Sequence, residues 1–456
     1  MANFSKSNVP TFSMDVYQNE YLPEGGREVN AIVTVTATGG GTIGAAVTAP
    51  HLYGPGQGPS AAVAVMVDCS GSMDYPSTKM RNARDATAAA IDTLRDGVHF
   101  AVIAGTHVAK EVYPGGGRLA VAGPTTREQA KHALRGLGAG GGTAIGTWLR
   151  LADRLLSSAD VAIRHGILLT DGRNEHESPE DLKAALAECA GRFTCDARGV
   201  GTDWEVKEVT GIAAALLGTA DIVADPSALS ADFTRMMETA MGKEVADVAL
   251  RVWTPVGTAI RFVKQVAPTV ADLTDRRTEA GPRAGDYPTG SWGDESRDYH
   301  LCVEVPAAGL GQEMLAARVS LVVPQPEGAA GSGAGGGVLN LGAQGLVRAV
   351  WTDDMTASTA MNAQVAHYTG QAELAKVIQQ GLDLRKAGDF DGATAKLGRA
   401  VQLASVSGNA DTAKLLSKVV DVVDATTGTV RLKAKVEEAD EMTLETRSTK
   451  TVRVKK

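Results

Sequence analysis

The sequence is poor in aromatic residues and in cysteine, and both shortages restrict what it can build. Phe, Trp and Tyr make up 4% of the 456 residues, so hydrophobic cores must rely on Ala, Val, Leu and Ile. The four cysteines, Cys69, Cys189, Cys195 and Cys302, form no CxxC pair and no dense framework. We therefore expect reduced thiols, with a Cys189–Cys195 disulfide as the less favoured alternative.

The sequence also lacks a surplus of positive charge and any long apolar run. Its net charge of −8 argues against a general nucleic-acid-binding surface, although Lys450–Lys456 is locally basic. No stretch approaches the roughly 20 apolar residues of a membrane span, and residues 1–20 lack the apolar core of a signal peptide. We expect a cytoplasmic protein with no membrane span and no nucleic-acid partner.

The composition is otherwise that of a folded protein with several domains. Hydrophobic residues make up 44% and charged residues 21% of the chain, which is an ordinary globular balance. The length suggests about two to four domains.

Alternating apolar and polar residues predict β-strands on both sides of a central region. Residues 29–37 alternate with period two, a second strand pattern reaches Val47, and the GPGQGP sequence at 55–60 indicates a domain boundary. Five more alternating stretches follow the central region: Val248–Trp253, Ala259–Val266, Tyr299–Val305, Met314–Val323 and Gly345–Trp351. Residues 279–296 and 326–337 between them are rich in turn residues. We expect 1–54 and 245–352 to form one antiparallel β-sandwich.

The central region, residues 60–242, alternates strand and helix patterns. Ala61–Val67 is a continuous apolar run, which is typical of a strand buried on both faces. Further strands are expected at Val98–Ala104, Val108–Tyr113, Ile163–Thr170, Cys195–Val200 and Asp221–Ala224, with helices at Lys79–Arg95, Arg127–Leu137, Ala144–Leu156, after Ser178, from Glu205 and at Ser227–Met241. Such repeated units predict an α/β fold with a doubly wound, mostly parallel sheet, inserted in the β-sandwich.

The C-terminal part is predicted to be helical and then charged. Residues 355–425 include a helix–turn–helix pattern around Lys386–Phe390 that resembles one tetratricopeptide-like hairpin. A small helical bundle is favoured, because a solenoid needs about three such repeats. Residues 426–456 are expected to form a mobile, charged tail. Thr443 and Thr446 follow an acidic run there and are candidate phosphorylation sites; a merely solvated tail is the favoured alternative.

Three polar residues follow the apolar run at 61–67, where a buried strand should end. Asp68, Ser70 and Ser72 alternate with Cys69 and Gly71 before the next predicted helix. In open α/β sheets, ligands bind beyond the carboxyl ends of the strands. Carboxylates and hydroxyls are hard oxygen donors that suit Mg²⁺, with Mn²⁺ also possible. The segment therefore lies where a ligand site is expected, and its chemistry is consistent with a divalent metal.

This Asp-x-Ser-x-Ser pattern resembles the first segment of the metal-ion-dependent adhesion site of von Willebrand factor A domains. Two further segments of that site have counterparts here. Thr143 follows the glycines at 140–142, and Asp171 follows the second buried strand in Leu168-Leu169-Thr170-Asp171-Gly172. The resemblance covers residues 60–242 and implies a Rossmann-like fold for them.

The resemblance also implies roles for individual residues. Ser70, Ser72 and Thr143 would bind the metal directly, while Asp68 and Asp171 would act largely through water. An open coordination position would accept an Asp or Glu side chain of a protein partner. We interpret Cys69 as buried packing, Asp74 as a solvated loop residue, and His176 as a surface residue that a partner could touch.

Catalysis is not expected. A metal hydrolase needs more carboxylates or histidines around an open ion, and the surroundings of Thr143 are glycine. The sequence contains no GxxxxGK[ST] loop and no GxSxG elbow.

The whole-chain pattern is similar to that of bacterial cytoplasmic proteins in which a von Willebrand A domain interrupts a β-sandwich. This similarity implies a signalling scaffold that binds protein partners, including members of Ser/Thr kinase and forkhead-associated pathways. The alternative function is an accessory subunit of a MoxR- or chelatase-type AAA ATPase.

Overall fold

The computed structural model describes residues 10–39, 60–324 and 338–454, and these fall into two compact units. The first unit, the α/β unit, contains residues 60–246 with Gly290–Gly293. The second contains residues 10–39, 247–289 and 294–454. The expected strand up to Val47, nearly all of the boundary loop at 55–60 and the 326–337 segment lie outside the described residues.

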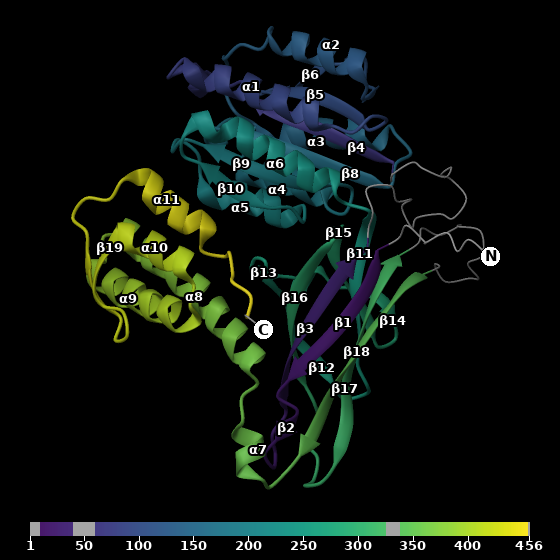
Figure 1. Ribbon diagram of the computed structural model, residues 1–456, viewed down its shortest axis with the longest axis vertical. Coiled ribbons are helices and arrows are strands. Elements are labelled where there is room, and N and C mark those ends of the chain that lie inside the picture. The colour runs from purple at the N-terminus through teal and green to yellow at the C-terminus, as the bar shows by residue number, and fades with distance from the viewer. Residues whose placement is uncertain (1–9, 40–59, 325–337, 455–456) are drawn as a thin grey trace, which may run out of the picture. The chain divides into compact units, whose positions relative to one another are not determined.

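The α/β unit is built on a seven-stranded sheet in which β10, β9, β8, β4 and β5 run parallel (Figure 1). The antiparallel strands β6 and β7 both pair with β5. All eight residues of the central strand β4 are buried, as a strand covered on both faces requires. The strands are β4 (Ala61–Asp68), β5 (His99–Gly105), β6 (Lys110–Tyr113), β7 (Ala120–Val121), β8 (Ile163–Thr170), β9 (Thr194–Val200) and β10 (Ala220–Val223).

Helices cover both faces of this sheet, which confirms the doubly wound prediction. Val63, Val65 and Val67 of β4 pack in one core with side chains of α1, α2 and α6, while α3 packs on β4, β5 and β8, and α5 on β9. The helices are α1 (Thr78–Thr93), α2 (Pro124–Leu134), α3 (Ile145–Ser157), α4 (Pro179–Cys189), α5 (Val206–Ala215) and α6 (Leu229–Met241), with 3-10 turns η1 (Gly71–Asp74) and η2 (Pro226–Ala228). Helix α4 starts where predicted, since the Ser178 side chain accepts a hydrogen bond from Asp181 N.

The second unit contains two sheets with strands from both flanks of the α/β unit. One sheet has the order β1-β3-β16-β12-β13, and the other β14-β15-β11-β17-β18-β2. Strand β18 pairs with β2 in parallel, whereas the pairs β1–β3, β3–β16, β16–β12, β12–β13, β14–β15, β11–β17 and β17–β18 are antiparallel. The strands are β1 (Thr11–Gln18), β2 (Tyr21–Leu22), β3 (Glu28–Thr38), β11 (Val245–Trp253), β12 (Ala259–Ala267), β13 (Ala271–Asp272), β14 (Thr278–Gly281), β15 (Ala284–Trp292), β16 (Glu295–Glu304), β17 (Glu313–Pro324) and β18 (Val338–Trp351), with the 3-10 turn η3 (Thr274–Arg276).

The interpretation of residues 279–296 as a turn-rich connection was wrong, because they include the strands β14 and β15. The sequence of β15, AGDYPTGSW, carries the Gly, Pro and Asp residues that normally indicate turns. Tertiary contacts override these preferences. Arg251 of β11 forms a bidentate ion pair with Asp286 of β15. The neighbouring Tyr287 is buried.

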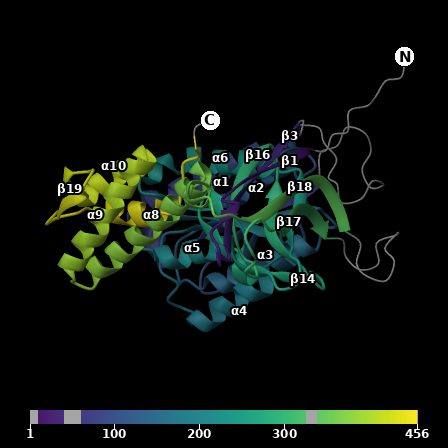
Figure 2. The same ribbon diagram turned by 90° about the horizontal axis from the view of Figure 1, so that it is seen from below.

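The prediction of a mobile tail at 426–456 was also wrong for its described part. After α7 (Met355–Thr359), α8 (Ala363–Lys386), α9 (Phe390–Ser407) and α10 (Ala410–Val419), the chain forms the hairpin β19 (Val420–Asp424) and β20 (Thr429–Leu432) and the helix α11 (Glu438–Arg447). Helices α8, α9 and α10 lie side by side (Figure 1 and Figure 2). Leu444 of α11 is fully buried in their shared core, and Lys386 pairs with the buried Glu445. Apolar burial therefore holds this segment.

Beyond α11 the chain is bonded to the first sheet of its own unit. Val270 N donates to Thr449 O at 2.8 Å, and Thr451 N donates to Pro268 O at 3.0 Å. The buried Asp298 of β16 accepts hydrogen bonds from Thr34 of β3 and Tyr368 of α8 and forms an ion pair with Arg453. One carboxylate thus joins two strands, a helix and the C-terminal segment.

All four cysteines are free and buried, so Cys189 and Cys195 form no disulfide. Across the described ranges, no helix is both long and apolar enough to cross a membrane.

Leu444→Ala should lower the free energy of unfolding by about 2–5 kcal/mol, because it leaves a cavity in the core shared with Leu397 and Leu416. Urea titration followed by circular dichroism measures this loss. Val406→Ala is the matched control, since Val406 on α9 is 82% exposed and should change stability by about 0.5 kcal/mol or less. Equal, small effects for both variants would mean that α11 does not pack as described.

Candidate metal centre

The predicted metal-site residues come from two adjacent strand ends and one loop. Strands β4 and β8 are parallel neighbours, with Val67 opposite Leu169, so Asp68 lies beside Thr170 and Asp171. Thr143 lies just before α3. Two backbone hydrogen bonds draw the loops together, from Gly71 N to Gly141 O at 2.9 Å and from Gly140 N to Cys69 O at 2.8 Å.

The three hydroxyl groups converge on one point, which Gly172 marks. A Cβ atom built at Gly172 would lie 2.9 Å from Ser72 Oγ, 3.5 Å from Thr143 Oγ1 and 3.7 Å from Ser70 Oγ. Ser70 Oγ and Ser72 Oγ share a hydrogen bond of 2.9 Å. The three hydroxyls expected to bind the metal directly therefore all lie within 4 Å of the position that a Cβ at residue 172 would take.

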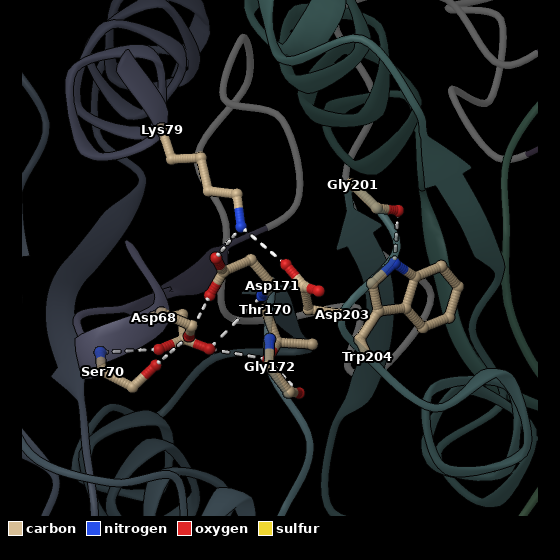
Figure 3. A network of polar contacts seen from close by, with 10 residues as sticks. Asp68, Ser70, Lys79, Thr170, Asp171, Gly172, Gly201, Asp203 and Trp204 are labelled. Atoms are coloured by element: carbon tan, nitrogen blue, oxygen red, sulfur yellow. Dashed lines mark hydrogen bonds and ion pairs between the residues drawn. The ribbon is translucent and has the colours of Figure 1, made fainter. Parts of the chain in front are cut away.

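Asp68 is fully buried and its carboxylate is held by neighbouring donors (Figure 3). Oδ1 accepts from Ser70 N at 2.8 Å, and Oδ2 accepts from Thr170 Oγ1 at 2.7 Å and from Asp171 N at 3.4 Å. Burial raises the pKa of Asp68 to about 6, although the hydrogen bonds from Ser70 and Thr170 oppose the shift. A cation next to this group would favour its charged form.

Asp171 divides its two oxygens between the hydroxyl cluster and a lysine (Figure 3). Oδ1 accepts from Ser72 Oγ at 2.7 Å, and Oδ2 lies 2.8 Å from Lys79 Nζ. The same ammonium lies 3.1 Å from Asp203 Oδ2, on the loop after β9. Burial alone would lower the pKa of Lys79, but Asp171 and Asp203 raise it, so the ammonium stays charged.

Two histidines pack against the glycine loop before Thr143. His176 Nδ1 accepts from Thr143 N at 3.3 Å, and His176 N donates to Thr143 O at 2.9 Å. His107 Nδ1 accepts from Gly142 N at 3.5 Å. Both rings belong to exposed residues, and they help to fix the backbone that presents the Thr143 hydroxyl.

The structure brings all five predicted metal-site residues together, and of the other candidates His176 contacts this group through Thr143. Cys69 is buried in the core, where desolvation raises the pKa of its thiol to about 12, and Asp74 is exposed. Thr443 and Thr446 lie on α11 in the other unit, and their hydroxyls donate to the carbonyls of Ala439 and Met442. Thr446 is 3% exposed, so a kinase would reach it only if α11 opened.

Sequence reasoning missed Lys79 and Thr170. A lysine in the first turn of an amphipathic helix is normally solvated, so nothing in its spacing indicated a buried ion pair. Thr170 offered a signal, because it immediately precedes Asp171 at the end of a buried strand.

The donor set fits a hard divalent cation. It consists of three hydroxyls and two carboxylates, all oxygen ligands of the kind that Mg²⁺ and Mn²⁺ prefer. No cluster of three or more His, Cys, Asp or Glu side chains placed to hold a metal occurs within the described ranges.

Two segments match known families. Residues 63–173 match the von Willebrand factor type A domain, and residues 402–448 match the von Willebrand factor type A C-terminal domain. The second match extends across α11, so the boundary expected at residue 425 falls inside one family segment. A search of curated proteins finds no match.

Solved structures show likenesses of very different strength. A von Willebrand factor type A protein from Catenulispora acidiphila is 51% identical over 99% of both chains, with a TM-score of 0.89. The ArnB paralog VWA2 from Sulfolobus acidocaldarius is 13% identical over 96% of this chain and 98% of its own, with a TM-score of 0.56, and shares the fold. Mussel byssus proximal thread matrix protein 1 with a zinc occupied MIDAS motif is 23% identical over 40% of this chain and 46% of its own. Its TM-score of 0.34 is too low for an inference about this chain.

The likeness to the Catenulispora protein includes both units and leaves almost no part of either chain unmatched. The family segment at 63–173 also contains all five residues that converge at the ends of β4 and β8 and before α3. The protein described here belongs to the von Willebrand factor type A family.

Proposed function

We propose that the α/β unit is a metal-dependent protein-binding module rather than an enzyme. Ser70, Ser72 and Thr143 would hold Mg²⁺, or Mn²⁺, directly, and Asp68 and Asp171 would hold it through water. The bound cation would offer an open position to an Asp or Glu side chain of a partner. The convergence of the three hydroxyl oxygens around Gly172 carries this proposal.

The neutral hydroxyls explain why such a site would bind rather than simply store a cation. Hydroxyl oxygens neutralise none of the charge of a divalent ion, so the ion keeps a strong attraction for an anionic ligand. The buried carboxylate of Asp68 accepts hydrogen bonds from Ser70 and Thr170. The buried carboxylate of Asp171 accepts hydrogen bonds from Ser72 and Lys79. Because their oxygens already accept these hydrogen bonds, the two carboxylates position the neighbouring groups and are poorly available as a general base. This favours binding over catalysis.

Gly172→Ala should remove metal binding while leaving the fold intact. The new Cβ would lie within 4 Å of all three hydroxyl oxygens and would displace the nearest of them, Ser72 Oγ at 2.9 Å, which is a side-chain atom and not backbone. Differential scanning fluorimetry with MnCl₂ or EDTA measures the effect: we expect a Mn²⁺-dependent rise in Tm for the wild type and none for the variant.

Gly211→Ala is the matched control for that experiment. A Cβ at Gly211, on α5, meets no atom within 4 Å, so the variant should keep the full metal response and gain up to about 1 kcal/mol of stability. A wild-type protein whose Tm ignores both Mg²⁺ and Mn²⁺ would contradict the proposed metal site.

Metal binding should weaken as the pH falls through about 6. Because burial raises the pKa of Asp68 to about 6, acid places on this carboxyl a proton that the cation must displace. The stability of the metal-free protein should change with pH in the opposite direction. The folded state binds the proton on Asp68 more tightly than the unfolded state does, so the contribution of Asp68 to the free energy of unfolding falls as the pH rises from about 4 to 6. The Mn²⁺-induced Tm shift should therefore be several-fold smaller at about pH 5 than at about pH 7.5. A shift that is the same at both pH values would contradict this assignment of Asp68.

Partner capture should depend on the metal. Affinity purification of the full chain from native cells in Mg²⁺ should retain a partner that EDTA releases and that the Gly172→Ala variant fails to bind. A co-purifying AAA ATPase would favour an accessory-subunit function, and kinase-pathway proteins would favour a signalling scaffold. Partners that resist EDTA would contradict binding through the cation.

A further inference from the structure

Lys79 is a buried cation that contacts Asp171, one of the carboxylates of the proposed metal site. It lies in the first turn of α1, is 6% exposed, and its ammonium lies 2.8 Å from Asp171 Oδ2 and 3.1 Å from Asp203 Oδ2 (Figure 3). Asp171 is fully buried, while Asp203 is 69% exposed. The strongest partner of Lys79 is therefore one of the two carboxylates that support the metal site.

A single carboxylate, that of Asp171, connects the ammonium of Lys79 to the hydroxyl cluster of the proposed metal site. Asp171 Oδ2 contacts Lys79, and Asp171 Oδ1 contacts Ser72, whose hydroxyl belongs to the converging set. Asp171, Ser70 and Lys79 are all buried, with exposed fractions of 0%, 2% and 6%. Charges in such surroundings interact more strongly than charges on the surface.

We propose that Lys79 is a fixed internal counter-charge that lowers the affinity of this site for metal, an inference that rests on the function proposed above. Two buried carboxylates alone would attract a divalent cation strongly. The ammonium cancels one of their charges and repels the incoming ion. The site therefore releases its metal more easily than its oxygen donors alone would allow.

Lys79 also orients Asp171, and this second effect has the opposite sign. Loss of a group that positions a metal-site residue normally weakens binding. Asp171 has another anchor, however, because Ser72 Oγ still donates to Oδ1 at 2.7 Å. Removal of Lys79 would leave the buried carboxylate positioned but without a counter-charge, which is a state that a metal ion relieves.

Lys79→Met should tighten Mn²⁺ binding to the full chain by about tenfold or more, as measured by isothermal titration of metal-stripped protein. Its Tm in EDTA should fall, and the rise in Tm on adding Mn²⁺ should exceed that of the wild type. Lys79→Arg keeps the charge and should stay close to the wild-type affinity. Because Coulomb energy scales with charge, Tb³⁺ should gain more from Lys79→Met than Mn²⁺ does.

Lys131→Met is the matched control for the loss of an ion-paired lysine. Lys131 on α2 pairs with Asp92 and Glu128. Asp92 lies about 13 residues along α1 from Lys79, or roughly 20 Å at 1.5 Å per residue. This variant should bind Mn²⁺ as the wild type does.

Asp203→Asn tests the same idea from the other side, and it remains informative if Lys79→Met folds poorly. Asp203 partly offsets the charge of Lys79, so its neutralisation should weaken Mn²⁺ binding. We expect a small effect of about two- to threefold, since the side chain is exposed and screened. Unchanged or tighter binding in Asp203→Asn would contradict the proposal.

The outcomes separate this inference from the proposed function. Wild-type protein that binds neither Mn²⁺ nor Tb³⁺ would overturn both. Wild-type protein that binds, with Lys79→Met binding equally or more weakly, would overturn the counter-charge alone and make Lys79 a positioning residue. An equal gain for both ions would also reject an electrostatic cause.

Discussion

The hydrogen bond from Thr170 to the buried carboxylate of Asp68 is the contact on which the site depends. Strands β4 and β8 are covered on both faces, so polar groups at their ends lose water and need partners within the protein. The parallel register supplies them, since it puts the Thr170 hydroxyl 2.7 Å from Asp68. The geometry of the hydroxyl cluster follows from this requirement, because Asp68 in turn holds the backbone of Ser70.

Local signals in the sequence were sufficient to predict the α/β unit, whereas the complete five-residue site was predicted from the resemblance of three segments to the von Willebrand A adhesion site. A fully buried strand gives a continuous apolar run, and the polar residues after Val67 and Leu169 mark where two such strands end. Adjacent parallel strands bring their carboxyl ends to one edge. The strand Ile163–Thr170 and the start of α4 after Ser178 follow from the same kind of pattern.

The features that sequence reasoning missed depend on contacts between distant residues. The ion pair of Lys79 needs Asp171, which is far along the chain, and its helix gives no sign that the lysine is buried. Strand β15 is held by Arg251 although its own sequence favours turns. The sequence of α11 resembles a charged tail, but Leu444 packs among the side chains of α9 and α10. In each case tertiary packing outweighs local preference.

The pairing of β3 with β16 sets an order for folding during synthesis. The two strands are far apart in the sequence. For example, Thr36 of β3 and Ser296 of β16 share a hydrogen bond and are 260 residues apart. At about 5–20 residues per second, the ribosome needs roughly 13 to 50 seconds to supply the second strand. The central strand β4 and its parallel neighbours emerge within that interval. The α/β unit, and the site it carries, can therefore assemble before β16 becomes available to pair with β3.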